Sequence, residues 1–299
     1  MVARFFRCVF GIWIVLQAAS VHSQNALPPT VNEYVYALPP AWTATPYTDG
    51  LVLMSPPSAT NERCVFTVWP MRPSGTNLMR DAYGAFQEIY RQYEPRNLTV
   101  RGTPMPSTVA RGVSGQGWEY VLVKRGVAPP GSPESRLAFV LAIKLRDRLA
   151  VISGVSRDPL VSTCMGELAG NVWPRFFYSL SFRGWTPTDQ SDAMRQKMAG
   201  TWTAATGTAA TQFVFVADGR YSDAAATRRP RTTQAYFGSG AYTLRGNAIS
   251  LTPDGERPET GFVRVEDEST DDGRTWTPVL YLLRVSAVDG RDYEVRYLK

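Results

Sequence analysis

The chain has 299 residues and a net charge of +6 at pH 7, and 44% of its residues are hydrophobic while 19% are charged. One hydrophobic core usually organises about 100 to 200 residues, so we expect two domains. This composition excludes a disordered chain and a polytopic membrane protein. The positive excess is small and is not concentrated in one basic face, which argues against a nucleic-acid-binding protein.

Residues 1–23 are predicted to form a secretory signal peptide. Arg4 and Arg7 give a positive start, an apolar run over 8–16 follows, and small or polar residues precede Gln24. The run is shorter than the about 20 apolar residues that span a bilayer. An uncleaved membrane anchor is the alternative. The mature chain is therefore expected to be secreted, periplasmic or extracellular, without a transmembrane segment.

Cleavage would remove Cys8 and His22, so that the mature chain has two cysteines, Cys64 and Cys164, and no histidine. Without histidine, Ser-His and Cys-His nucleophiles and His-ligated zinc are excluded. Two cysteines cannot complete a four-thiolate metal site. We therefore assign no catalytic residue, no metal ligand and no cofactor. In an oxidising compartment one Cys64–Cys164 disulfide is favoured, with two unrelated buried thiols as the alternative.

The mature chain is expected to begin with a flexible lead-in over residues 24–33, followed by strands and one amphipathic helix. The helix is predicted between Asn77 and Tyr93, where apolar residues follow a helical period, and Pro95 ends it. The predicted strands are Trp42–Pro46, Gly50–Met54, Cys64–Trp69, Thr99–Gly102, Gly117–Arg125, Arg136–Leu145 and Arg148–Val155. The last two strands are predicted to form a hairpin.

A second helix is predicted to start at Asp158-Pro159, where an N-cap residue is followed by proline. Its apolar stripe includes Cys164, which places this cysteine on a buried face where it can meet Cys64. Pro174 is expected to kink or end the helix before residues 176–182.

The order of these elements, with the Leu38-Pro-Pro-Ala-Trp42 opening and the segment Leu51-Val-Leu-Met-Ser-Pro56, resembles the PsbP-like or DcrB-like α/β/α sandwich over residues 34–183. The resemblance implies an antiparallel sheet and a small secreted or periplasmic accessory domain, in a family where catalysis is not the usual role. It transfers no functional residue, because that family offers no shared catalytic motif to place on these positions.

Residues 184–198 are predicted to be a linker that ends in a short helix over Ala193–Met198, and residues 199–299 a second domain of short strands and tight turns. Its Gly200-Thr-Trp202 opening and its Phe215–Tyr221 and Tyr293–Tyr297 segments resemble small bacterial lipocalin-like, or calycin, barrels. The predicted fold class is therefore α+β, an α/β/α sandwich followed by an all-β up-and-down barrel.

Strand alternation predicts which barrel side chains point inward. These are Phe213, Phe215, Tyr242, Leu244, Ile249, Leu251, Phe262 and either Leu280 with Leu282 or Tyr281 with Leu283. An open interior would be an apolar ligand cup, and small barrels usually fill it with side chains instead; both alternatives stay open. The candidate ligand-binding residues are Phe213, Phe215, Tyr221, Tyr242, Leu244 and Arg284.

We therefore expect a secreted or periplasmic, non-catalytic binding or accessory protein that acts through envelope protein partners or a small apolar ligand. The alternative is a His-independent hydrolase that uses a Ser-Lys pair or carboxylates, for which Glu119, Glu134 and Asp147 are candidates. An acidic run over Glu266–Asp272 is interpreted as a solvated hairpin loop, and less readily as a calcium site, because it lacks EF-hand spacing.

Overall fold

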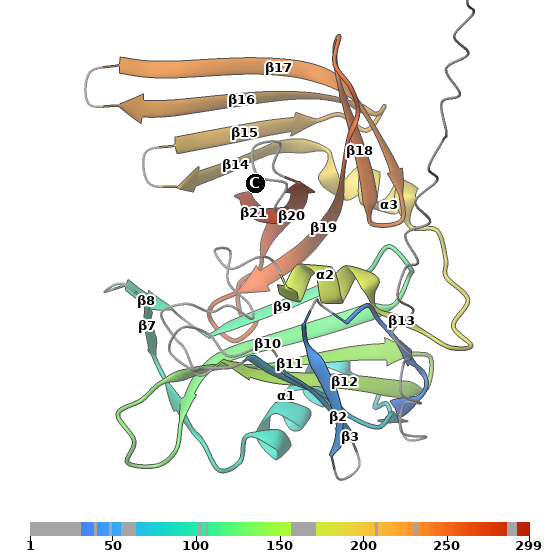
Figure 1. The fold of residues 1–299 in the computed structure, drawn as a ribbon, viewed down its shortest axis with the longest axis vertical. Helices are drawn as coiled ribbons and strands as arrows, with labels where there is room; N and C mark the ends of the chain where they lie inside the picture. Colours follow the sequence, from blue (N-terminus) through green and yellow to red (C-terminus); the bar gives the residue numbers. More distant parts are fainter. Residues whose placement is uncertain are drawn as a thin grey trace, which may run out of the picture.

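The computed structural model describes residues 31–38, 41–47, 50–54, 64–100, 103–105, 107–156, 172–206, 209–229, 232–285 and 292–299. Strands dominate these residues. An antiparallel sheet forms the N-terminal half and a closed barrel forms the C-terminal half, and the barrel lies above the sheet in Figure 1. The predicted helix start at Asp158-Pro159 and Cys164 lie outside the described residues.

The N-terminal sheet has the strand order β2-β3-β4-β12-β11-β10-β9, and every pair is antiparallel. The strands are β2 (Thr43–Tyr47), β3 (Gly50–Met54), β4 (Cys64–Val68), β9 (Thr108–Val113), β10 (Glu119–Ala128), β11 (Arg136–Leu145) and β12 (Arg148–Ser156). Short pairings add β5 (Arg72–Pro73) to β12, β6 (Glu94–Arg96) to β10, β1 (Tyr34–Val35) to β13 (Ser181–Phe182), and β7 (Leu98–Val100) to β8 (Thr103–Met105). The predicted hairpin is confirmed as β11 and β12.

Helix α1 (Leu78–Ile89) packs on one face of this sheet. It begins after Asn77, whose side-chain oxygen accepts a hydrogen bond from the Arg80 N–H at 3.0 Å, an N-cap that satisfies one free backbone donor. Its buried residues, among them Phe86, pack against the outward side of β10 and β11 that carries Val121 and Val140. The helix predicted from the apolar period is thus confirmed, with its end at Ile89 rather than Tyr93.

Helix α2 (Val172–Ser179) packs on the opposite face and lies between the sheet and the barrel (Figure 1). Phe177 meets the rings of Trp118 and Tyr120 at centroid distances of 5.4 and 5.1 Å. Pro174 does not end a helix, because α2 includes it and continues to Ser179. The helix predicted from Asp158, which Pro174 is expected to kink, begins outside the described residues, so the kink stays a prediction.

The C-terminal half is a closed antiparallel barrel of eight strands in up-and-down order, as the meander predicts. Each strand pairs with the next, and the pairing of Thr203 with Leu298 closes β14 onto β21. The strands are β14 (Gly200–Thr206), β15 (Ala209–Phe215), β16 (Arg220–Arg229), β17 (Thr232–Arg245), β18 (Ala248–Pro253), β19 (Glu259–Ser269), β20 (Thr277–Val285) and β21 (Asp292–Leu298).

Side chains from all sides of the barrel pack against one another in its interior. Phe213 and Phe215 are stacked with centroids 5.4 Å apart, and Phe215 meets Tyr242 edge-on at 5.3 Å. Helix α3 (Ser191–Met198) adds Met194 and Met198 to the same core. The helix predicted at the end of the linker is therefore confirmed, and it packs onto the barrel core.

The structure also shows which side chains of β20 and β19 point into the barrel. Leu280 and Leu282 point into the barrel, and Tyr281 and Leu283 point out. The inward prediction for Phe262 is wrong. Phe262 pairs with Ala248 and Leu283 on the outer face and is 40% exposed, whereas the next residue on β19, Val263, points into the barrel core.

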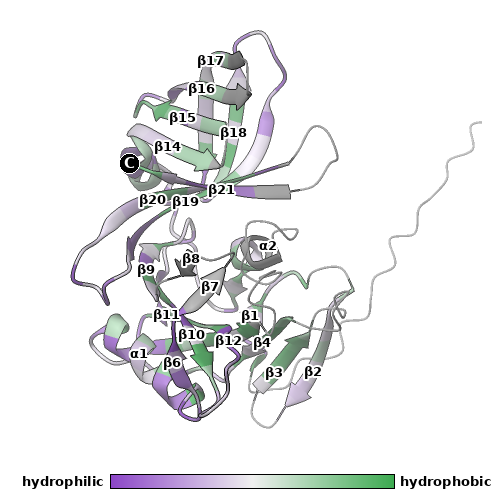
Figure 2. Ribbon diagram, turned by 90° about the vertical axis from the view of Figure 1, so that its left-hand side faces the viewer, coloured by the Kyte–Doolittle hydropathy of each residue, from purple (hydrophilic) through white to green (hydrophobic). Residues whose placement is uncertain are grey.

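The sheet and the barrel are joined through strand pairing. β19 pairs with β20 inside the barrel and, over its last residues, with β9 of the N-terminal sheet, so that Gly112 lies opposite Glu266. Figure 2 shows the barrel directly above the edge of the sheet. The two halves therefore share main-chain hydrogen bonds. Within the described ranges, no helix is both long enough and apolar enough to cross a membrane.

Candidate functional site at the junction of sheet and barrel

A cluster of buried and half-buried polar side chains lies where α2 and β10 cover the outer face of the barrel. This junction cluster consists of Tyr120, Tyr178, Arg264, Glu266, Glu268, Tyr281, Glu294 and Arg296. Alternation explains its position, because Val263 and Val265 point into the barrel core while Arg264 and Glu266 between and beyond them point outward. On a free barrel that outer face would be in water.

Arg264 is the centre of the cluster and is 4% exposed. Its guanidinium contacts Glu294 at 2.5 Å and Glu266 at 3.5 Å. The same group lies 3.8 Å from the centre of the Tyr281 ring, a cation–π distance. The Tyr178 hydroxyl lies 3.3 Å from Glu294. Arg264 thus joins barrel strands β19, β20 and β21 to helix α2.

Glu268, also on β19, receives its side-chain hydrogen bonds from barrel residues. Glu268 accepts hydrogen bonds from Arg296 at 2.6 Å and from the Tyr281 hydroxyl. Burial raises the pKa of Glu268, but Lys124, Tyr281 and Arg296 outweigh it, so that its pKa lies below the usual range. Burial raises the pKa of Glu294. Burial also raises the pKa values of Tyr120, Tyr178 and Tyr281, so the three phenols remain hydrogen-bond donors at neutral pH.

A glycine lets the N-terminal half reach this cluster. Tyr120, Gly112 and Glu266 lie in one row across β10, β9 and β19. The Tyr120 ring crosses Gly112, where a Cβ would lie 2.7 Å from the hydroxyl oxygen, and the hydroxyl donates to Glu266 at 2.7 Å. The Tyr120–Glu266 contact between the two halves therefore requires a residue without a side chain at position 112.

Two concave surfaces border the junction. The first, the apolar groove, has a volume of 610 Å³ and lies between α2 and the outer faces of β17 to β20. Its outer walls include Tyr178, Phe262, Leu283 and Arg284, while Leu244 and Ile249, which also border it, belong to the barrel core as predicted. Tyr178 and Phe262 are stacked with ring centroids 5.0 Å apart and an interplanar angle of 17°.

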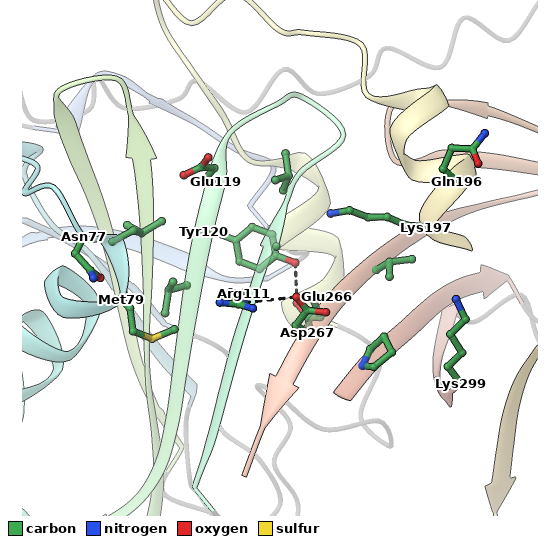
Figure 3. A pocket seen from close by; sticks show the side chains of 16 residues that line it. Asn77, Met79, Arg111, Glu119, Tyr120, Gln196, Lys197, Glu266, Asp267 and Lys299 are labelled. Atoms are coloured by element: carbon green, nitrogen blue, oxygen red, sulfur yellow. Dashed lines mark hydrogen bonds and ion pairs between the residues drawn. The ribbon is translucent and has the colours of Figure 1, made fainter. Parts of the chain in front are cut away.

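The second surface, the junction cleft, has a volume of 620 Å³ and is bordered by β9, β10, α3 and the chain after β21 (Figure 3). Charged side chains from these elements line it: Arg111, Glu119, Lys197, Asp267 and Lys299. Arg111 forms an ion pair with Asp267 at 3.5 Å and lies 4.1 Å from the centre of the Trp276 ring.

The predicted ligand-binding residues divide between two places. Phe213, Phe215, Tyr221 and Tyr242 are buried in the barrel core, where the Tyr242 hydroxyl donates to the Val216 carbonyl at 2.8 Å. Burial raises the pKa of Tyr221 to about 12. The other two, Leu244 and Arg284, line the apolar groove, and Arg284 is ion-paired with Glu259.

The carboxylates proposed for a hydrolase come from separate elements. Glu119 lines the junction cleft, Glu134 pairs with Arg136 at 3.5 Å, and Asp147 lies in the turn between β11 and β12. The interpretation of Glu266–Asp272 as a solvated loop is wrong at its start, because Glu266 and Glu268 belong to β19 and are buried.

The junction cluster is the part of the site that the sequence does not reveal. Arg264, Glu266, Glu294 and Arg296 alternate with apolar residues, as solvent-facing positions of a barrel do, and no local signal separates a solvated outer face from a covered one. The chain matches no protein-family model and no curated protein.

Proposed function

We propose that the protein is a secreted or periplasmic, non-catalytic binding protein that holds a small apolar ligand in the apolar groove. The observation that carries the proposal is the stacked pair Tyr178 and Phe262 in a groove of 610 Å³, next to a barrel interior filled by side chains. Small-molecule sites have volumes of about 300 to 1,000 Å³ and mainly apolar walls. The groove meets both criteria.

The groove is also built on rigid elements. Leu283 and Ile249 are nearly fully buried, and Tyr178 is fixed by the junction cluster through its hydroxyl. Phe262 leaves 40% of its surface exposed, which is apolar area that a ligand can cover. Arg284 at the edge of the groove supplies a polar contact for one end of the ligand.

The test is binding of the uncharged fluorescent dye N-phenyl-1-naphthylamine to the wild type, to Phe262→Ser and to Phe237→Ser. Phe237 is the matched control, because it is 79% exposed on β17 and does not line the groove. Because 40% of Phe262 is exposed, covering that part contributes about 0.6 to 1.2 kcal/mol, so we expect Phe262→Ser to weaken dye binding about three- to eightfold. Equal binding by both variants would contradict the proposal.

We also propose that residues 1–23 are a signal peptide, that the mature protein is exported, and that its N-terminal half has a PsbP-like accessory role. An envelope protein is the alternative partner. Native mass spectrometry of protein purified from its host separates the two: a bound small molecule supports the ligand, and ligand-free protein that co-purifies with an envelope protein supports the partner.

The proposal also keeps the Cys64–Cys164 disulfide as a prediction. Cys64 is buried at the start of β4, and Cys164 lies outside the described residues. We expect the intact mass of the exported protein to rise by two hydrogens, about 2 Da, on reduction. Alkylation of two thiols without reductant would show that the pairing is wrong.

The alternative function, a His-independent hydrolase, has one observation in its favour, since the Glu266 and Glu294 carboxylates both lie beside the Arg264 guanidinium at the junction. Glu294 forms an ion pair with Arg264, and Glu268 forms one with Arg296. The Glu266 carboxylate accepts a hydrogen bond from the Tyr120 hydroxyl. A screen of glycosidase and ester substrates tests it. Turnover that is lost in Glu266→Gln would favour the hydrolase over the binding protein.

A further inference from the structure

We infer that the junction cleft is a second binding site, for a small organic anion such as a phosphate monoester. The cleft lies at the fork where β9 leaves β19, beside α3 and the chain after β21 (Figure 3). Its volume of 620 Å³ accommodates a small molecule. Its walls come from both halves of the chain, which the paired strands hold in fixed register.

Three cationic side chains from three different elements line this cleft. Arg111 of β9 is already neutralised by Asp267. Lys197 of α3 and Lys299 after β21 form no ion pair with any described residue. Two ammonium groups that line the same cleft, without a carboxylate partner in the described ranges, attract an anionic group.

Lys299 is positioned by its surroundings. Its ammonium lies 5.4 Å from the centre of the Trp202 ring, a cation–π distance. Its chain crosses Gly200, where a Cβ would lie 2.9 Å from the Lys299 Cε. Gly200 has a φ of 127°, a conformation that side-chain-bearing residues rarely adopt. The side chain of Lys299 therefore lies over Gly200 and beside the Trp202 ring, at the Gly-Thr-Trp opening of the barrel.

The remaining walls define the rest of the ligand. Met79, Val121, Val265 and Pro278 provide apolar surface. The carboxylates of Glu119 and Asp267 disfavour a molecule with negative charge along its whole length, as a polyanion has. One anionic group on a small apolar body fits this distribution.

The experiment is isothermal titration calorimetry of the full chain with phenyl phosphate, inorganic phosphate and phenol. We expect phenyl phosphate to bind more tightly than either of its parts. Replacing two charge-assisted contacts in Lys197→Ala/Lys299→Ala should weaken its binding about tenfold or more. The control is Arg183→Ala/Arg220→Ala, which removes the same charge from exposed positions that do not line the cleft.

Equal melting temperatures of the two double variants would show that both are folded. No binding of phenyl phosphate to the wild type, or equal binding by the two double variants, would overturn the site. Phosphate binding as tight as that of phenyl phosphate would overturn the apolar part of the ligand. None of these results depends on the apolar groove, which the Phe262→Ser variant tests separately.

Discussion

At the scale of single residues, Arg264 determines whether the junction holds together. Burial disfavours the charged guanidinium of Arg264 and so lowers its pKa. Glu294 and Glu266 outweigh burial, so that the pKa of Arg264 lies well above the usual value. A buried ion pair adds little net stability compared with a well-packed apolar alternative, but removing one partner leaves the other charge buried. The cluster is therefore sensitive to truncation of a single member.

We predict that Arg264→Ala lowers the free energy of unfolding by about 3 to 5 kcal/mol, because the buried Glu294 carboxylate loses its arginine partner. Urea denaturation measures the change. Arg220→Ala is the control, since its ion pair with Asp254 at 3.7 Å is exposed and such pairs contribute about 0 to 1 kcal/mol. Similar small losses in both variants would show that the junction cluster is not coupled to folding.

At the scale of elements, the row of Tyr120, Gly112 and Glu266 connects three strands from the two halves. The shared edge between β9 and β19 removes an exposed strand edge from both the sheet and the barrel region. The Tyr120 ring crosses Gly112, so this pairing requires glycine at position 112.

We predict that Gly112→Ala destabilises the fold by about 1 to 3 kcal/mol, because its Cβ forces the Tyr120 ring off Glu266. In a Tyr120→Ala background, Gly112→Ala should lower the free energy of unfolding much less. A double-mutant cycle by urea denaturation measures this coupling between the two residues. Additive losses would mean that the ring and the glycine do not interact.

The sequence predicts elements well and their surroundings poorly. Alternation and turn residues locate β3, β11, β12 and the barrel strands, and the apolar period locates α1, because these signals are local. Phe262 is assigned to the wrong face, since its strand continues from a glycine-containing stretch in which either phase is compatible with the pattern. Glu266 of β19 looks solvated because its partner, Tyr120, is 146 positions away.

At the scale of the whole molecule, the two halves behave as one body in the structure. They share the β9–β19 pairing, and the junction cluster takes side chains from both. The two-domain expectation from length therefore describes two architectures, with an apolar cluster on each face of the sheet and a third inside the barrel.

We predict a single cooperative unfolding transition for the wild type, because separating the halves would expose the charged cluster and break paired strands. Near-ultraviolet circular dichroism and tryptophan fluorescence, recorded with increasing urea, should give coincident curves. Arg264→Ala should separate the curves or broaden them. Two well-resolved transitions in the wild type would show that the halves unfold independently.

The central claim is that the ligand lies in the apolar groove and not inside the barrel. Chemical-shift mapping by NMR with N-phenyl-1-naphthylamine tests it most directly. We predict shifts at the amides of Phe262 and Leu283, which face the groove, and none at those of Phe213 and Phe215 in the barrel core. Shifts confined to Phe213 and Phe215 would place the ligand inside the barrel and contradict the account.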